Sequence, residues 1–187
     1  MKEKMGYRYG FSRYYLLTVV LSFLGWCFET GYLYWKTGEW QDCGFMTLPF
    51  CPIYGCTLLL VYLLLGAPHK PRGLLTNVAP TFLRYALYLA LAFLIPSIME
   101  YVVGLFFDKV FHLRLWDYTG VPYNVNGYVC LPVSLVWAVL IFLFMRFLFL
   151  PIKRVVGKVP VLLAWVLLVL TAGIFGADVI ANVMKQL

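Results

Sequence analysis

Five long runs of hydrophobic residues, separated by short polar segments, make up most of the chain. A helix that crosses a membrane needs roughly 20 mainly apolar residues. Runs of about this length lie at about 14–35, 46–65, 81–107, 128–150 and 161–184. The pattern predicts an all-α integral membrane protein, in which one transmembrane domain, residues 1–187, contains about five transmembrane helices.

The second run contains two prolines close together, in the stretch "CGFMTLPFCPIYGC" (43–56). Pro49 and Pro52 cannot both lie in a regular helix interior, because proline lacks an N–H and clashes with the preceding turn. We therefore expect an extended or broken segment that enters the membrane before a helix settles near Tyr54. Such backbone persists at membrane depth only where protein or a water-filled cavity satisfies it. The alternative is that the prolines simply open the helix.

Composition supports a membrane protein. The chain is 63% hydrophobic and 12% charged, and this charged share is about half that of a soluble domain. The first run is too long for a signal-peptide core and shows no small-residue cleavage pattern, so we expect a retained span. The net charge of +7 is typical of a membrane protein with basic cytoplasmic loops, and no nucleic-acid partner is expected.

The positions of the basic residues predict the orientation. With the N-terminus inside, 11 of the 15 Lys and Arg residues lie at the cytoplasmic side or its edge. These are Lys2, Lys4, Arg8, Arg13, Lys70, Arg72, Arg84, Arg146, Lys153, Arg154 and Lys158. The other four are Lys36, Lys109, Arg114 and Lys185. Because cytoplasmic loops carry the excess of basic residues, we expect the N-terminus inside and the C-terminus outside, in the cell (plasma) membrane.

The cysteines and histidines give little sign of a metal or cofactor. Five Cys residues form no CxxC pair and only two His residues are present, so neither a structural metal site nor a cofactor is expected. Buried small hydrophobic residues are the expected role of most of these cysteines. Cys43 and Cys51 fall on the outer side in this topology, and whether they pair is left open.

Three acidic residues lie inside the predicted spans: Glu29, Glu100 and Asp178. At about 1.5 Å per helical residue they lie roughly 22, 28 and 25 Å from the cytoplasmic end of their spans. In a hydrocarbon core about 30 Å thick, all three therefore belong to the outer third. We expect them to share a polar pocket that opens outward. The alternative is that acids near span ends merely mark the membrane boundary.

Each acid has small or polar neighbours at positions that favour an inward orientation. The sets are Ser22 and Gly25 with Glu29, Pro96 and Gly104 around Glu100, Thr171 and Asn182 with Asp178, and Cys130, Ser134 and Trp137 on the fourth span. Small and polar residues on one stripe are typical of the interfaces between membrane helices.

The outer loop "RLWDYTGVPYNVNGYVC" (114–130) is dense in hydrogen-bonding side chains. We expect a lid or wall above the three acids, in which Arg114 or Lys109 pairs with one of them. Trp116 would sink into the interface, Asp117 would stay polar, and a tight turn would lead into the fourth span. The expected hydrogen-bonding residues are Tyr118, Tyr123, Asn124 and Asn126, and the turn residues are Asn124, Asn126 and Gly127. The alternative is an interfacial loop with no ligand.

Several of these segments resemble the ABC-transporter type IV, or CmpB-like, family of bacterial permeases. They are "FLGWCFE" (23–29), "GFMTLPFCPIYG" (44–55) and "MEYVVGLFFDKVFHLRLWDYTGVPYNVNGYVCLPVSLVW" (99–137), with "WDY" and N-x-N-G the most distinctive. They cover the first four spans, whereas the fifth matches as a generic apolar helix. Thr47-Leu48-Pro49 departs from the glycine that relatives often carry there. The resemblance marks as site positions Glu29, Glu100, Trp116, Asp117, Tyr118, Asn124, Asn126 and Gly127.

Three functions remain open at this stage. The first is a membrane transport component that binds a cationic or protonatable solute at the acids. The second is an intramembrane enzyme for a lipid or lipid-linked substrate, with Glu29 or Glu100 as general acid or base and Arg114 on a head group. The third is an assembly subunit without a site. GxxxxGK[ST], GxSxG and HExxH are absent, which favours a non-enzyme. Membrane lipid, a separate ATPase subunit and further copies of the chain are the expected partners.

Overall fold

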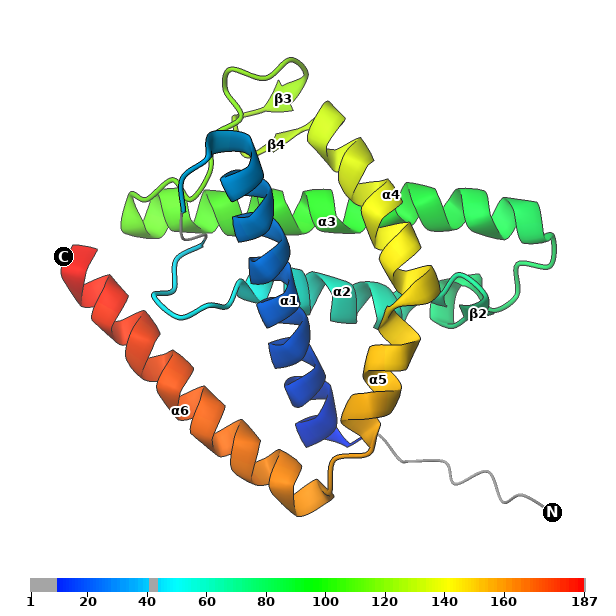
Figure 1. Ribbon diagram of the computed structural model, residues 1–187. Coiled ribbons are helices and arrows are strands. Elements are labelled where there is room, and N and C mark those ends of the chain that lie inside the picture. Colours follow the sequence, from blue (N-terminus) through cyan, green and yellow to red (C-terminus); the bar gives the residue numbers. More distant parts are fainter. Residues whose placement is uncertain (1–9, 41–43, 187) are drawn as a thin grey trace.

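The computed structural model describes residues 10–40 and 44–186 and is mostly helical in that part (Figure 1). The helices are α1 (Phe11–Thr37), α2 (Pro52–Leu65), α3 (Thr81–Phe111), α4 (Leu131–Phe147), α5 (Phe149–Gly157) and α6 (Val161–Gln186). A 3-10 turn, η1, covers Gly73–Leu75. Two antiparallel hairpins pair β1 (Gly66–Ala67) with β2 (Lys70–Pro71) and β3 (Asn124–Val125) with β4 (Val129–Cys130).

Three of these helices are each long and apolar enough to cross a membrane: α1, α3 and α6. The consecutive helices α4 and α5 meet the same test only together, and they are bent by 49°. α2 is apolar but has only 14 residues. The chain is therefore a helical membrane protein, and residues 10–40 and 44–186 contain three candidate spans, or four if the bent pair counts as one.

Prolines determine two helix boundaries that differ from the expected ranges. α2 begins at Pro52 rather than at residue 46, with Pro52 in its first turn and the preceding residues 44–51 non-helical. Both interpretations of this stretch were partly right, since Pro52 opens the helix and Pro49 lies in the irregular segment. The fourth run breaks after Phe147, because Pro151 cannot donate to the carbonyl of Phe147 and clashes with it.

The tightest helix contact joins α1 and α2, at two glycines. A Cβ atom on Gly25 would lie 2.5 Å from the Cβ of Tyr54. A Cβ atom on Gly55 would overlap the hydroxyl of Ser22 and the carbonyl oxygen of Thr18. Small residues allow membrane helices to approach this closely, so the predicted inward face of the first span, with Ser22 and Gly25, is confirmed.

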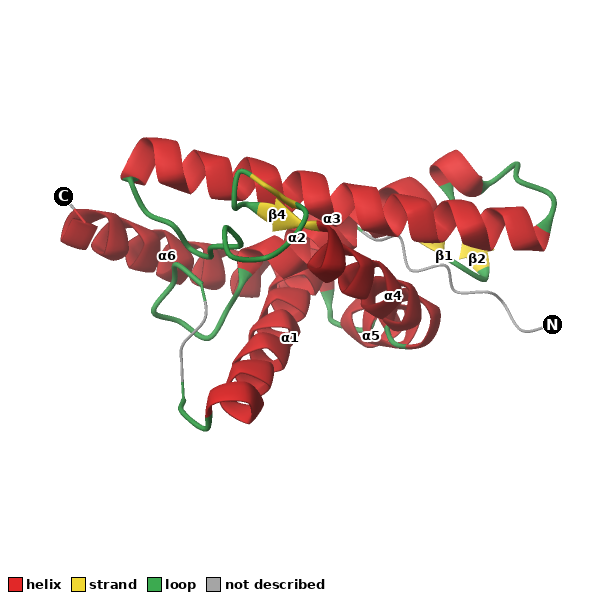
Figure 2. Cartoon of the chain, turned by 90° about the horizontal axis from the view of Figure 1, so that it is seen from above, coloured by secondary structure: helices red, strands yellow, loops and turns green. Residues whose placement is uncertain are grey.

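The apolar core lies toward one end of the bundle, where α1 to α5 converge. Its fully buried members include Leu17, Leu65, Tyr88, Met145 and Phe149. α6 packs mainly against α1 and lies at the edge of the bundle, away from α4 (Figure 1). Viewed from above, the β3–β4 hairpin lies along α3 (Figure 2), and β4 contacts both α3 and α4. The loop between α3 and α4 is thus supported by both helices.

Candidate functional site

The loop between α3 and α4 folds into a compact hairpin. Tyr118 N donates to the Gly127 carbonyl at 2.9 Å, and Trp116 Nε1 donates to the Tyr128 carbonyl at 2.8 Å. Asn126 (φ 54°) and Gly127 (φ 75°) both adopt the left-handed conformation at the β3–β4 turn. Asn and Gly are the residues that adopt it at least cost. The tight turn predicted from Asn124, Asn126 and Gly127 is confirmed.

Two polar side chains of the loop hold its own backbone. Asp117 Oδ1 accepts from the Thr119 amide at 2.9 Å. This amide bond, followed by the nearby Arg114 cation, lowers the pKa of Asp117 below its usual range. Asn124 accepts from the Gly127 amide at 3.1 Å and donates to the Val121 carbonyl at 2.9 Å. Asp117 and Asn124 therefore order the loop, with part of their hydrogen-bonding capacity already used.

Gly127 offers a direct test of this loop. An alanine there would adopt a positive φ and bring its Cβ to 2.7 Å from Thr119 Cγ2 and 3.0 Å from Asp117 Oδ1. Such strain costs about 1–3 kcal/mol, so Gly127→Ala should expose the loop to limited proteolysis at lower protease concentration. Gly120→Ala is the matched control, because no atom lies within 4 Å of its would-be Cβ. Equal cleavage of the two variants would contradict this loop geometry.

Arg114 pairs with acids that were not among its expected partners. Its Nη1 lies 3.1 Å from Asp117 Oδ1 and its Nε lies 4.0 Å from Asp108 Oδ2 on α3. The Tyr128 hydroxyl donates to the same Asp108 oxygen, and this bond is the main cause of the raised pKa of Tyr128. The prediction that Arg114 or Lys109 pairs with Glu29, Glu100 or Asp178 is wrong for Arg114, whose partners are Asp117 and Asp108. It missed Asp108 because α3 continues to Phe111 instead of ending near residue 107.

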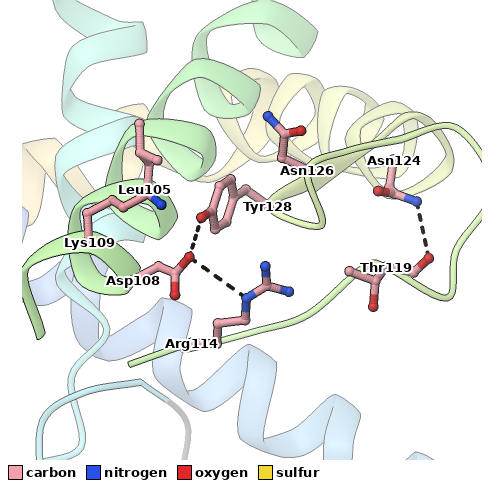
Figure 3. Close-up of a pocket in the computed structure, with 8 residues that line it drawn as sticks. All are labelled: Leu105, Asp108, Lys109, Arg114, Thr119, Asn124, Asn126 and Tyr128. Atoms are coloured by element: carbon pink, nitrogen blue, oxygen red, sulfur yellow. Dashed lines mark hydrogen bonds and ion pairs between the residues drawn. The ribbon is translucent and has the colours of Figure 1, made fainter. Parts of the chain in front are cut away.

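A pocket of about 580 Å³ opens between this network and the end of α3 (Figure 3). It is lined by Leu105, Asp108, Lys109, Arg114, Thr119, Asn124, Asn126 and Tyr128. The Asp108 carboxylate lies between the Tyr128 hydroxyl and the Arg114 guanidinium in Figure 3. Asn126 Nδ2 donates to the Tyr101 hydroxyl at 3.0 Å and so ties the hairpin turn to α3. Arg114, Asn124 and Asn126 thus share one outer cavity, together with Lys109.

Glu29 on α1 and Glu100 on α3 face a second polar cluster, deeper in the protein. Tyr54 and Cys51 both hydrogen-bond to Glu29, the latter through Sγ at 3.8 Å from Oε2. Glu100 is close enough to interact electrostatically with Glu29 and with Tyr54. Both carboxyl groups are partly buried. Two acids from separate helices therefore lie within electrostatic range of each other and of Tyr54, at the start of α2.

Tyr118 joins the outer loop to this acid pair. Burial is the main cause of the raised pKa of its hydroxyl, and the charges of Glu100, Cys130 and Glu29 add to it. The Tyr118 hydroxyl is therefore buried within electrostatic range of both carboxyl groups. We define the acid-pair cluster as Glu29, Cys51, Tyr54, Glu100 and Tyr118. Sequence reasoning did not select Tyr54, although its position after two prolines was a usable signal.

Asp178 contacts a different element. Its Oδ2 accepts from the Thr47 amide at 3.0 Å, and Asn182 Oδ1 accepts from the Thr47 hydroxyl at 3.1 Å. The polar face of α6 therefore binds the irregular segment 44–51, whose last residue, Cys51, donates its amide to the Ser22 carbonyl at 3.1 Å. This satisfies non-helical backbone, as expected for that segment. Cys43 lies outside the described residues, so the question of whether it pairs with Cys51 is not addressed by the structure.

These features define the protein as a multi-pass helical membrane protein with a polar, hydrogen-bonded loop between α3 and α4. A family model described as "Putative ABC-transporter type IV" matches residues 16–183, and the chain belongs to this family. The resemblance in sequence rested on motifs of the first four predicted spans, whereas the family match also includes most of α6. No curated protein and no solved structure matches the chain.

Proposed function

We propose that this protein is a permease-type transport component of the plasma membrane that binds a cationic or protonatable solute between Glu29 and Glu100. The solute would enter from the outer side, past the loop 112–130. The single observation that carries the proposal is that Tyr54 hydrogen-bonds to Glu29 of α1 and lies within electrostatic range of Glu100 of α3.

The chemistry of the acid-pair cluster supports a cation as its ligand. The recorded hydrogen-bond partners of Glu29 are a phenol and a thiol, Tyr54 and Cys51, and neither supplies a positive charge. An ionised carboxylate in a membrane is costly unless it is paired. A solute cation between the two acids would offset that cost and be held by both helices.

The distribution of charge supports five spans, with the N-terminus inside and the C-terminus outside, in one domain of residues 1–187. The start of α1, the β1–β2 hairpin and α5 lie toward the lower and right-hand part of Figure 1. The last turns of α1, α3 and α6 and the β3–β4 hairpin lie toward the upper left. The basic residues Arg13, Arg72, Arg84, Arg146 and Arg154 all belong to the first group of segments or their neighbours. In this topology α2 completes its crossing with the irregular segment 44–51.

The proposal extends to partners of the chain, which would supply the energy for transport and complete the transport pathway. The chain has no GxxxxGK[ST] loop, so transport driven by ATP would need a separate ATPase subunit. Five short spans make a thin wall for a pathway, and we therefore include a homo-oligomer in the proposal. The lipid bilayer itself is the remaining partner.

Uptake into reconstituted vesicles tests the proposal. The purified full-length protein would be placed in liposomes, with radiolabelled methylammonium and sodium as probes and pyranine fluorescence for protons. We expect uptake of at least one probe above empty liposomes and its loss in Glu29→Gln. Glu39→Gln is the matched control, because Glu39 is exposed just beyond the end of α1.

Two results would contradict the proposal. The first is uptake that is identical in Glu29→Gln and in the unmodified protein. The second is an absence of uptake for all three probes together with a changed lipid profile in cells that overproduce the protein. This second result would favour the intramembrane enzyme.

A further inference from the structure

Basic side chains converge at the end of the bundle opposite the outer loop. The Tyr62 ring on α2 stacks on Phe149 of α5, with ring centroids 4.6 Å apart. Arg72 Nη1, just after β2, donates to the Tyr62 hydroxyl at 2.9 Å. Lys153 Nζ, on α5, lies 5.1 Å from the centroid of the same ring. Tyr62 therefore brings the segment after α2 and the α4–α5 elbow together, each with a basic residue.

His69, at the turn between β1 and β2, extends this convergence. Burial is the main cause of the lowered pKa of its imidazole, and the nearby charges of Arg146, Lys70 and Arg154 lower it further. Its Nδ1 is enclosed and has no hydrogen-bond partner within the described part of the chain. We call His69, Lys70, Arg146 and Arg154 the basic cluster. An imidazole nitrogen that is enclosed among three cations is well placed to bond an anionic oxygen.

The two segments that build the basic cluster carry no acid that could neutralise it. The sequence contains no Asp or Glu from residue 43 to residue 99, nor from residue 118 to residue 177. Like charges that gather without a counter-charge repel one another. An anion bound among them would offset that repulsion, and phosphate is one of the anions that Arg side chains bind through paired N–H groups.

The surroundings of the basic cluster favour a lipid as the source of this phosphate. Large apolar side chains next to the cluster are open on the surface, among them Leu74 (64% exposed), Phe147 (61%) and Val155 (66%). In a bilayer these side chains lie against acyl chains, so the phosphate nearest to the cluster is that of a lipid headgroup. Basic pockets between membrane helices on one face of the bilayer commonly hold anionic headgroups.

We propose that the basic cluster, at the meeting of the β1–β2 hairpin with the α4–α5 elbow, binds the phosphate headgroup of an anionic phospholipid. Arg146 and Arg154 would hold the phosphate oxygens, His69 Nδ1 would donate a further hydrogen bond, and the acyl chains would lie along Phe147 and Val155. The bound lipid would connect the α2–α3 segment to α5 and stabilise the bend between α4 and α5. This inference is independent of the solute site at Glu29 and Glu100.

Lipid binding to the purified full-length protein in detergent tests the inference. Native mass spectrometry would be used to titrate phosphatidylglycerol, phosphatidylcholine and inorganic phosphate. We expect phosphatidylglycerol to bind more tightly than phosphatidylcholine. Each Arg near a bilayer surface contributes roughly fivefold to anionic-lipid affinity, so Arg146→Gln and Arg154→Gln should each weaken binding by about that factor.

Lys36→Gln is the matched control, because it removes one positive charge at the far end of α1 and should leave phosphatidylglycerol affinity unchanged. Arg154 is exposed, so its variant should fold even if Arg146→Gln does not. Equal affinity for the two lipids would overturn the inference, as would Arg154→Gln binding no more weakly than Lys36→Gln. Displacement of phosphatidylglycerol by equimolar inorganic phosphate would also overturn it, since the ligand would then be free phosphate.

Discussion

Replacing Gly55 by leucine is expected to prevent stable folding of the whole helical bundle. A side chain at this position would overlap the Ser22 hydroxyl and the Thr18 carbonyl oxygen of α1, and would lie 3.1 Å from the Ser22 amide. Backbone atoms within a helix cannot move aside as a flexible side chain can. Overpacking costs about 1–3 kcal/mol, and we expect the upper end or more here, because α1 and α2 would have to separate.

The measurement is the unfolding midpoint of the detergent-solubilised protein, followed by tryptophan fluorescence and by monodispersity on gel filtration. Gly31→Leu is the matched control. Gly31 lies in α1, but no atom lies within 4 Å of its would-be Cβ. We expect Gly31→Leu to unfold at the midpoint of the unmodified protein. If Gly55→Leu does the same, α1 and α2 are not packed through Gly55.

The hydrophobic pattern was sufficient to predict the class of protein, but not the continuity of each helix. The run 128–150 predicted one span, whereas α4 ends at Phe147 and α5 begins at Phe149. Pro151 was visible in the sequence, yet a proline near the end of a run can either terminate a helix or open the next one. The apolar residues on both sides of the break made the two outcomes look alike.

The depth of the three acids along their helices correctly predicted that Glu29 and Glu100 lie near each other. The position of each helix in the bundle decides that Asp178 lies elsewhere. Glu29 and Glu100 meet because α1 and α3 both lie against α2. Asp178 has a similar depth, but α6 packs on the outside of α1 and so brings its acid to Thr47. Counting residues gives the height of a side chain in the membrane but not the order of helices around the bundle, which depends on tertiary packing.

The partners of Arg114 were missed because α3 ends four residues later than the predicted end of the third span, residue 107. α3 ends at Phe111, followed by His112 in the left-handed conformation (φ 53°). This extra turn places Asp108 on a helix beside the loop, where it pairs with Arg114 and Tyr128. Helix termini are the least reliable part of a pattern-based prediction, since fraying and capping decide them locally. The hairpin was more predictable because Asn126 and Gly127 favour the turn by themselves.

Replacing Glu29 and Glu100 singly by glutamine is expected to weaken solute uptake as much as replacing both. Removal of one charged partner from a desolvated pair costs about 3–5 kcal/mol, which corresponds to roughly 100-fold or more in apparent affinity. If one cation contacts both carboxyl groups, the second substitution has little left to remove, so the two effects should be far from additive. The measurement is the concentration dependence of methylammonium or sodium uptake in vesicles for each single variant and the double variant.

Asp178→Asn separates a two-acid site from the three-acid site that residue counting suggested. Its carboxylate accepts the Thr47 amide at 3.0 Å, so the variant should lower the free energy of unfolding by about 1 kcal/mol and leave the apparent affinity for the solute close to that of the unmodified protein. Its effect should add to that of Glu29→Gln, because the two acids contact different groups. A 100-fold loss of affinity in Asp178→Asn, with no further loss when Glu29 is also replaced, would instead place all three acids around one solute and contradict the separation of α6 from the acid-pair cluster.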